Sequence, residues 1–334
     1  MSSSTSSFEQ AAVAGWSKWL VRYLVTLAVL AAALALFVVV MDPFSTGRFA
    51  LTQRIDITTS NPRLSDAALV RDKRFNGAIF GDSVAIGLDP QAVASQSKWR
   101  LLQLAMFAAS AREVTTVASA FERHHSDGST LEIFVVDSRW CSDDPKAQDS
   151  DAVFPAWLYN SNDATYLANL QLSSEAVVAS VTRLQIWAGL VQPPLREDGY
   201  APWSYGHNAA TFIQTRPVEA AAPTAPMPAL DVLAAHIAAL GDNRALAVVF
   251  APQHVSVLPV PGSAAAVRLE ACKQRVHDMV ARRPRAAYLD LMIENPLAQD
   301  AENFTDPLHL DGRGLPSFAA SVAQLIEQSG LKPD

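Results

Sequence analysis

The chain has 334 residues, half of them apolar, which suits one large α/β domain with additional segments. Its formal net charge of −7 leaves no basic field to attract phosphates, so we expect no nucleic-acid partner. The sequence shows no zinc-type spacing of Cys and His and no Gly-rich nucleotide fingerprint, and it therefore predicts neither a metal nor an organic cofactor.

The amino-terminal region predicts a tail followed by a membrane span. Residues 1–19 begin as a Ser- and Ala-rich stretch and are predicted to be a disordered cytoplasmic tail. Leu24 to Met41 is a run of 18 residues without charge, and with the residues from 20 onward it suits one membrane-spanning helix over 20–41. The run is longer than the apolar region of a cleavable signal peptide. A buried helix of a soluble domain is the alternative.

The residues that flank this run predict its orientation. Trp16, Trp19 and Tyr23 are typical of an aromatic belt at a membrane interface. Lys18 and Arg22 accompany them on the amino-terminal side, which favours a cytoplasmic amino terminus. We therefore expect a single-pass protein of a bacterial inner membrane with its carboxyl-terminal domain in the periplasm.

After a polar connector over 42–73, short apolar runs alternate with helical stretches in a domain that spans 74–334. Continuous rather than alternating apolar runs are expected when helices cover both faces of a sheet. The pattern predicts an α/β fold, a three-layer doubly wound parallel sheet. The strands are expected at 76–81, 99–104, 131–137, 245–251 and 286–291, and the main helices at 111–125, 262–283 and 315–326.

Residues 141–228 form an insertion after the third strand that is far longer than an ordinary connection. Within it, residues 166–190 are predicted to be helical, and residues 215–229 form a Pro- and Ala-rich linker. Because the insertion leaves the third strand at its carboxyl end, it is expected either to cap the active site or to form a peripheral surface for a partner.

Two short motifs supply the side chains of a serine nucleophile. Gly81-Asp82-Ser83 follows the first predicted strand, and Asp306-Pro-Leu-His309 precedes the last predicted helix. A Ser hydroxyl needs a neutral imidazole to take its proton, and the imidazole needs a carboxylate to fix its tautomer. Ligands bind at the carboxyl ends of strands in open α/β sheets, which is where Ser83 is expected. The alternative is an ordinary strand-to-helix turn capped by Asp82 or Ser83.

On these motifs, residues 74–330 resemble the GDSL/SGNH hydrolase superfamily, in particular its membrane-anchored bacterial members linked to O-acetylation of polysaccharides. The resemblance implies a flavodoxin-like sheet, Ser83 as nucleophile, and Asp306 and His309 as its partners. It also implies that the backbone N–H groups of Ser83 and Ala105 receive the oxyanion. The family's third block carries an Asn that donates to the oxyanion, whereas the corresponding stretch here, Val135 to Trp140, has none.

Several other side chains remain open at this stage. Arg139 is a candidate for substrate binding or for an ion pair with Asp137, and it stands where it could replace the missing oxyanion donor. His254 follows the fourth predicted strand and is a candidate either for substrate binding or for a structural role. The two cysteines, Cys141 and Cys272, could pair in an oxidising compartment, but the sequence does not show that they meet.

The sequence therefore predicts a membrane-anchored periplasmic serine esterase or O-acyltransferase. The resemblance implies that it acts on acyl groups, most simply acetyl groups, of a cell-envelope or secreted polysaccharide, with a membrane acyltransferase or glycan synthase as partner. The alternative is a non-catalytic binding or assembly subunit of a polysaccharide synthesis or acylation complex.

Overall fold

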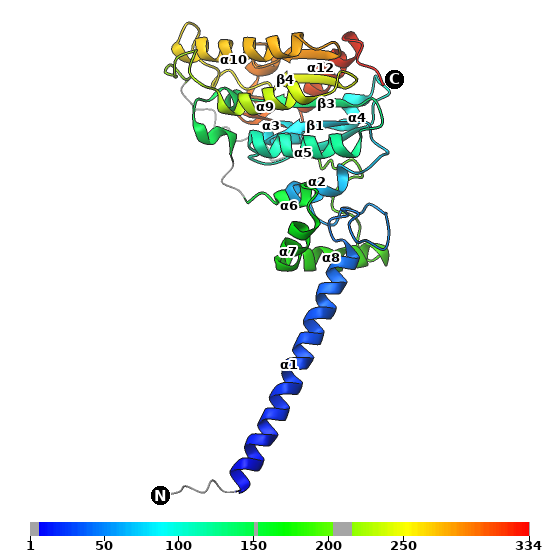
Figure 1. The fold of residues 1–334 in the computed structure, drawn as a ribbon. Coiled ribbons are helices and arrows are strands. Elements are labelled where there is room, and N and C mark those ends of the chain that lie inside the picture. The colour runs from blue at the N-terminus through cyan, green and yellow to red at the C-terminus, as the bar shows by residue number, and fades with distance from the viewer. Residues whose placement is uncertain (1–6, 150–152, 203–215, 334) are drawn as a thin grey trace, which may run out of the picture.

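The computed structural model describes residues 7–149, 153–202 and 216–333. It has three parts along one axis: the long helix α1 (Ser7–Met41), a helical base at the carboxyl end of α1, and an α/β domain above that base (Figure 1).

The α/β domain is built on a five-stranded parallel sheet with the strand order β2-β1-β3-β4-β5. This is the order of the flavodoxin-like doubly wound fold. All five predicted strands are present within one or two residues of their predicted ends, so the α/β class is confirmed. The strands are β1 (Gly77–Gly81), β2 (Leu101–Ala105), β3 (Leu131–Val136), β4 (Ala245–Phe250) and β5 (Ala286–Asp290).

Helices cover both faces of the sheet, which explains why each strand is a continuous apolar run. Because side chains alternate along a strand, Phe80 and Phe134 enter one core cluster, whereas Ile79 and Ile133 enter the other. The first cluster lies under α5 (Ala111–His124), α9 (Pro228–Ala239) and α10 (Ala264–Ala281). The second lies under α3 (Ser83–Ile86), α4 (Pro90–Ala94) and α12 (Leu315–Gln328).

Helix α1 is long and apolar enough to cross a membrane over Trp16–Met41. Only 11% of its most apolar window is buried within the protein, which does not fit a core helix of a soluble domain. The predicted disordered tail is wrong for residues 7–19, because the helix begins at Ser7. Alanines at positions 11, 12 and 14 have high helix propensity, and this outweighs the Ser-rich start.

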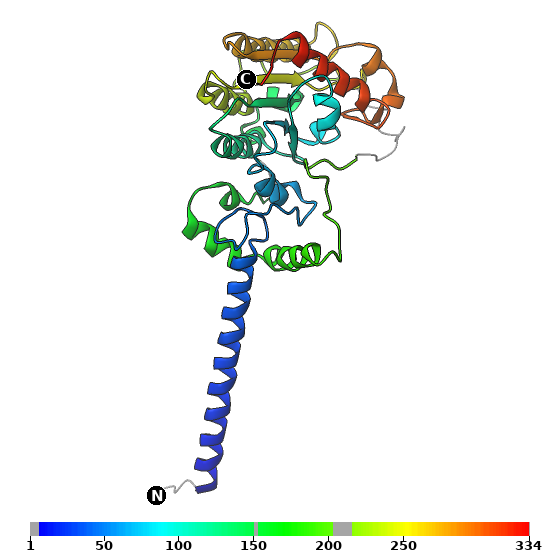
Figure 2. The same ribbon diagram turned by 90° about the vertical axis from the view of Figure 1, so that its right-hand side faces the viewer.

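The base consists of the connector and residues 156–187 of the insertion. The connector contains α2 (Pro62–Leu69), and the insertion contains α6 (Ala156–Tyr159), α7 (Asp163–Leu172) and α8 (Ser174–Trp187). The predicted helix over 166–190 is broken at Ser173, whose side chain caps α8. Figures 1 and 2 show α7 and α8 beside the carboxyl end of α1, on the side of the connector away from the α/β domain. The described helices α6, α7 and α8 therefore do not cap the active site, and the peripheral alternative holds for residues 156–187.

A buried arginine explains why the insertion folds down onto α1. Arg183 on α8 is fully buried and donates hydrogen bonds to the carbonyl oxygens of Met41 and Asp42, each at 2.5 Å. Its Nε also lies 3.1 Å from the carboxylate of Asp56 in the connector. A buried guanidinium needs such partners, and these stand at the end of α1 rather than at the sheet.

The remaining elements are short and lie at the carboxyl edge of the sheet. They are η1 (Ser138–Cys141), η2 (Pro145–Gln148), α11 (Pro296–Gln299), η4 (Ala301–Asn303), and the antiparallel pair β6 (Phe304–Asp306) and β7 (His309–Leu310).

Candidate active site

The turn after β1 presents Ser83 at the carboxyl edge of the sheet. A Cβ atom at Gly81 would stand 2.7 Å from the carbonyl oxygen of Val135, so the strand tolerates no side chain at that position. The buried side chain of Asp82 accepts a hydrogen bond from the amide of Val84 at 3.0 Å and caps α3. Asp82 is thus an N-cap, as the structural alternative supposed, and the cap fixes the direction of Ser83.

The hairpin of β6 and β7 supplies the other two side chains. Asp306 pairs with His309 across the hairpin, and Oδ2 of Asp306 lies 2.8 Å from Nδ1 of His309. The same carboxylate also accepts the backbone amides of Leu308, at 2.8 Å, and His309, at 3.1 Å. Burial alone would raise the pKa of Asp306, but its hydrogen bonds with His309 and Leu308 outweigh burial and hold the pKa below its usual value. Asp306 is therefore ionised at neutral pH.

The two motifs meet at His309. Its Nε2 lies 2.8 Å from Oγ of Ser83, although the residues are 226 positions apart. This distance is within the reach of direct proton transfer. The side chains of His309 and Asp306 are partly exposed, at 21% and 34%, so a substrate can approach them. The geometry is that of a nucleophile, a base and an orienting carboxylate.

The geometry does not bring the amide of Ala105 toward Ser83. Backbone N–H groups alternate in direction along a strand, and the amide of Gln103 donates to Asp198 on the open side of β2 at 2.8 Å. The amide of Ala105 points to that same side, whereas the amide of Met106 donates to Gly81 at 3.1 Å. The resemblance therefore assigned the second oxyanion donor to a residue whose amide faces away from β1.

The loop after β2 contains a feature that the sequence analysis missed. Ala108 has a φ of 49°, in the left-handed region that favours glycine. It lines the cavity beside Asp82. The sequence did not predict this turn, because a positive φ is usually indicated by glycine or asparagine and not by alanine.

Arg139 pairs with two buried carboxylates at the site. Its guanidinium bonds to Asp82, and its Nε lies 3.1 Å from Oδ2 of Asp137. The predicted pair with Asp137 is therefore present, and the pair with Asp82 was not foreseen. Burial raises the pKa of Asp137 to about 6, and burial lowers the pKa of Arg139. The guanidinium of Arg139 stays charged and half exposed, and it lies beside Asp82, which directly precedes Ser83.

A cavity of about 360 Å³ opens beside Asp82 and Arg139. The loop before α5 and the first part of the insertion, through Ser142, Lys146 and Asp149, line it. Among the described residues of the insertion, this first part therefore borders the cavity beside Asp82 and Arg139.

His254 packs against the β6–β7 hairpin through its backbone and its ring. Its backbone amide donates to the carbonyl oxygen of Pro307 at 2.8 Å, and its ring packs edge-on against Phe304 at 5.7 Å. The side chain is mostly buried, and its Nδ1 lies 2.9 Å from Oγ of Ser256. These contacts favour the structural role over substrate binding.

The two cysteines are joined. Cys141 at the end of η1 and Cys272 in α10 form a disulfide with a Cα separation of 5.5 Å. The bond ties the strand end that carries Arg139 to a helix 131 residues further along the chain. It answers the question that the sequence left open.

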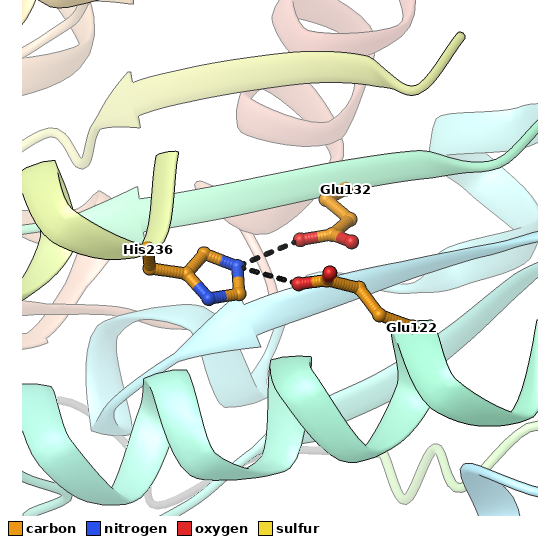
Figure 3. Close-up of side chains that lie close together, drawn as sticks. All are labelled: Glu122, Glu132 and His236. Carbon is orange, nitrogen blue, oxygen red and sulfur yellow. Dashed lines mark hydrogen bonds and ion pairs between the residues drawn. The ribbon is translucent and has the colours of Figure 1, made fainter. Parts of the chain in front are cut away.

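A second cluster of titratable side chains lies elsewhere. Nε2 of His236 stands 3.1 Å from Glu132 and 3.2 Å from Glu122 (Figure 3). These three could offer ligand atoms to a metal ion, since the atoms lie within 4.8 Å of one another. An imidazole N–H donating between two carboxylates accounts for the same contacts. Glu132 sits at the start of β3, at the opposite end of the sheet from Ser83, so the cluster takes no part in the site.

The site is that of an α/β protein with a hydrogen-bonded Ser-His-Asp set at the carboxyl edge of its sheet. The sequence matches no protein-family model and no curated protein. Among solved structures, it is similar to one described as "BT4096 a gut microbial diltiazem-metabolizing enzyme", with a TM-score of 0.32 and 8% identity. That match covers 76% of this chain, which spans 46% of the other.

Proposed function

We propose that the protein is a membrane-anchored serine esterase or O-acyltransferase of the SGNH type. The observation that carries the proposal is the hydrogen-bonded chain from Ser83 through His309 to Asp306. A serine within 2.8 Å of an imidazole whose other nitrogen meets an ionised carboxylate is arranged for nucleophilic attack.

In the proposed reaction, Oγ of Ser83 attacks the carbonyl carbon of an acyl ester while Nε2 of His309 takes its proton. The carbonyl oxygen becomes an oxyanion, which the backbone amide of Ser83 stabilises. His309 then returns the proton to the leaving alcohol, and an acyl-serine remains. Water or a sugar hydroxyl then attacks this ester while Nε2 of His309 takes its proton. The bond between the acyl carbon and Oγ of Ser83 breaks, His309 returns the proton to Oγ, and the free acid or the acylated sugar leaves.

Arg139 is the proposed replacement for the missing third-block Asn. It keeps a positive charge at the site while bonded to Asp82, next to the nucleophile. A fixed cation can stabilise a developing negative charge in a partly buried site. The turn at Ala108 borders the same cavity and is our candidate for the second backbone donor in place of Ala105.

The substrate class rests on the family resemblance. We propose an acetylated envelope or secreted polysaccharide, with a membrane acyltransferase or glycan synthase as partner, and with the α/β domain in the periplasm. The disulfide supports an oxidising compartment, because such bonds are rare in the cytosol. A reporter fused after Asp334 is expected to be active in the periplasm, and activity in the cytoplasm would reverse the orientation.

The deciding experiment compares Ser83→Ala with Ser321→Ala in the full chain in detergent. The full chain is needed because Asp42, directly after α1, accepts hydrogen bonds from Thr46 and Tyr166 in the base. With an activated acetate ester, Ser83→Ala is expected to reduce turnover to background without lowering the melting temperature. Ser321 is half-buried on α12 and donates to the carbonyl oxygen of Ser317 in the same helix at 2.9 Å, so its substitution is expected to leave turnover unchanged.

In cells, Ser83→Ala is also expected to change the acyl content of an envelope polysaccharide. If neither ester turnover nor glycan acylation differs from wild type, the protein is not a serine enzyme. The alternative, a non-catalytic binding or assembly subunit, then takes its place.

A further inference from the structure

Helix α8 exposes large apolar side chains after its first turn. Val178 is 66% exposed, Val181 44%, Leu184 50% and Trp187 37%. Leu190, just past the helix end, is 74% exposed. At 3.6 residues per turn, Val178, Val181 and Leu184 lie within about 120° of one another, and we call these three side chains the apolar stripe of α8.

The buried side of α8 includes two polar side chains, whereas Ser174 and Glu175 in its first turn are exposed. Ser180 and Arg183 are both fully buried on the face opposite the stripe. A surface helix of a soluble domain normally buries its apolar face and exposes its polar one. The exposed stripe departs from this pattern, and it indicates an interaction surface because contiguous exposed apolar patches mark such surfaces.

The base places this stripe at the end of the apolar helix. Nε2 of Gln171, at the end of α7, donates to the carbonyl oxygen of Ala35 at 3.3 Å, and Arg183 bonds to that of Met41. Figures 1 and 2 show α8 lying across the axis of α1 in both views, with the connector between α8 and the α/β domain. Because Arg183 faces the connector, the stripe faces toward the amino-terminal part of α1.

The length of the uncharged run in α1 indicates how far the bilayer extends along this helix. The uncharged run Leu24–Met41 has 18 residues, which at about 1.5 Å per residue spans about 27 Å. A hydrocarbon core is about 30 Å thick, so the membrane would use this run to its end. Ala35 and Met41, the residues that α7 and α8 contact, then lie inside the boundary of the hydrocarbon layer.

We propose that α8 lies flat in the outer interface of the membrane, with its apolar stripe among the lipid acyl chains. This inference rests on the membrane anchoring in the proposed function. The occupant is lipid because the stripe continues the lipid-facing surface of α1, and because Trp187, whose indole donates to Asp56 at 2.8 Å, is typical of an interface. A second contact beside α1 would hold the α/β domain at a fixed height and tilt above the membrane.

The test uses nitroxide labels on single introduced cysteines in the full chain, reconstituted in phosphatidylethanolamine–phosphatidylglycerol liposomes. The native cysteines are paired and do not react without a reductant. Labels replace Val181 and Leu184 in the stripe. Val29 in α1, 62% exposed, reports the anchor, and Val267 on α10, 49% exposed, is the matched aqueous control. Collision rates with oxygen, which enriches in lipid, and with a water-soluble nickel chelate give the depth of each label.

We expect Val29→Cys to lie deepest, Val181→Cys and Leu184→Cys to favour oxygen over the nickel chelate at shallower depth, and Val267→Cys to favour the chelate. If the stripe labels match Val267→Cys while Val29→Cys remains deep, the anchor stands and the inference is overturned. If the stripe labels are shielded from both reagents, a protein covers the stripe and lipid does not, which also overturns it. If Val29→Cys itself is aqueous, the anchor in the proposed function fails.

Discussion

Replacing Arg183 by Met is the sharpest test of how the base is held together. Met keeps the volume and the flexible stem of the side chain but removes the guanidinium. In the native structure this group is fully buried, and it donates to three carbonyl oxygens, of Met41, Asp42 and Arg54, and to the carboxylate of Asp56. All four acceptors lose a partner at once.

The loss in the free energy of unfolding depends on which hydrogen-bond donors each acceptor retains after the substitution. Asp56 retains Nε of Arg54 at 2.7 Å and the indole of Trp187 at 2.8 Å, so it is not left alone. The carbonyl oxygens of Met41 and Asp42 lose a buried donor, which costs about 1–3 kcal/mol each. Breaking a buried ion pair from one side typically costs about 3–5 kcal/mol, and we expect Arg183→Met to fall in that range.

Thermal unfolding of the full chain in detergent measures this loss. For a domain of about 150–250 residues, 1 kcal/mol lowers the melting temperature by about 2–4 °C, so we expect a drop of at least about 6 °C. The matched control is Arg112→Met, which removes an exposed pair with Asp149, where both side chains are more than half exposed. An exposed pair contributes about 0–1 kcal/mol. If the two variants melt within about 2 °C of each other, Arg183 does not hold the base.

Three further predictions concern the site and its support. Asp306→Asn is expected to lower kcat/KM for an activated acetate ester by about 10⁴-fold at an unchanged melting temperature, because His309 loses the partner that fixes its tautomer; a loss below about tenfold would contradict the assignment. The pKa of Asp137 is raised by burial to about 6, so the folded state binds its proton more tightly than the unfolded state does, and this contribution to stability is lost as the pH rises from about 4 to 6. Asp137→Asn is therefore expected to show a smaller fall in melting temperature than wild type over that interval, and parallel curves would refute the assignment. Replacing both Cys141 and Cys272 by Ser opens a crosslink across 131 residues and is expected to cost about 2–5 kcal/mol of stability; wild type and variant that melt together would show that the bond does not form in the protein.

The sheet and the pairing of the two motifs could be predicted from the amino-acid sequence. Each strand is a short, continuous apolar run between helical stretches, which is typical of a parallel sheet covered on both faces. Ser83 follows the first strand, and the carboxyl ends of parallel strands share one edge, so a serine there could be expected to face an Asp-His motif placed just before the last helix. The pairing of Asp137 with Arg139 was also within reach, because two residues on one strand end are local neighbours.

The position of residues 156–187 beside α1, the pairing of the cysteines and the orientation of the amide of Ala105 could not be predicted from the sequence. The insertion folds toward α1 because Arg183 finds its acceptors at Met41 and Asp56, more than 120 residues earlier in the chain. No local pattern encodes such a partner. The disulfide likewise depends on a Cα separation of 5.5 Å between η1 and α10. The amide of Ala105 faces away from β1 because the register of β2 directs the amide of Met106 to Gly81, and register is a property of the assembled sheet.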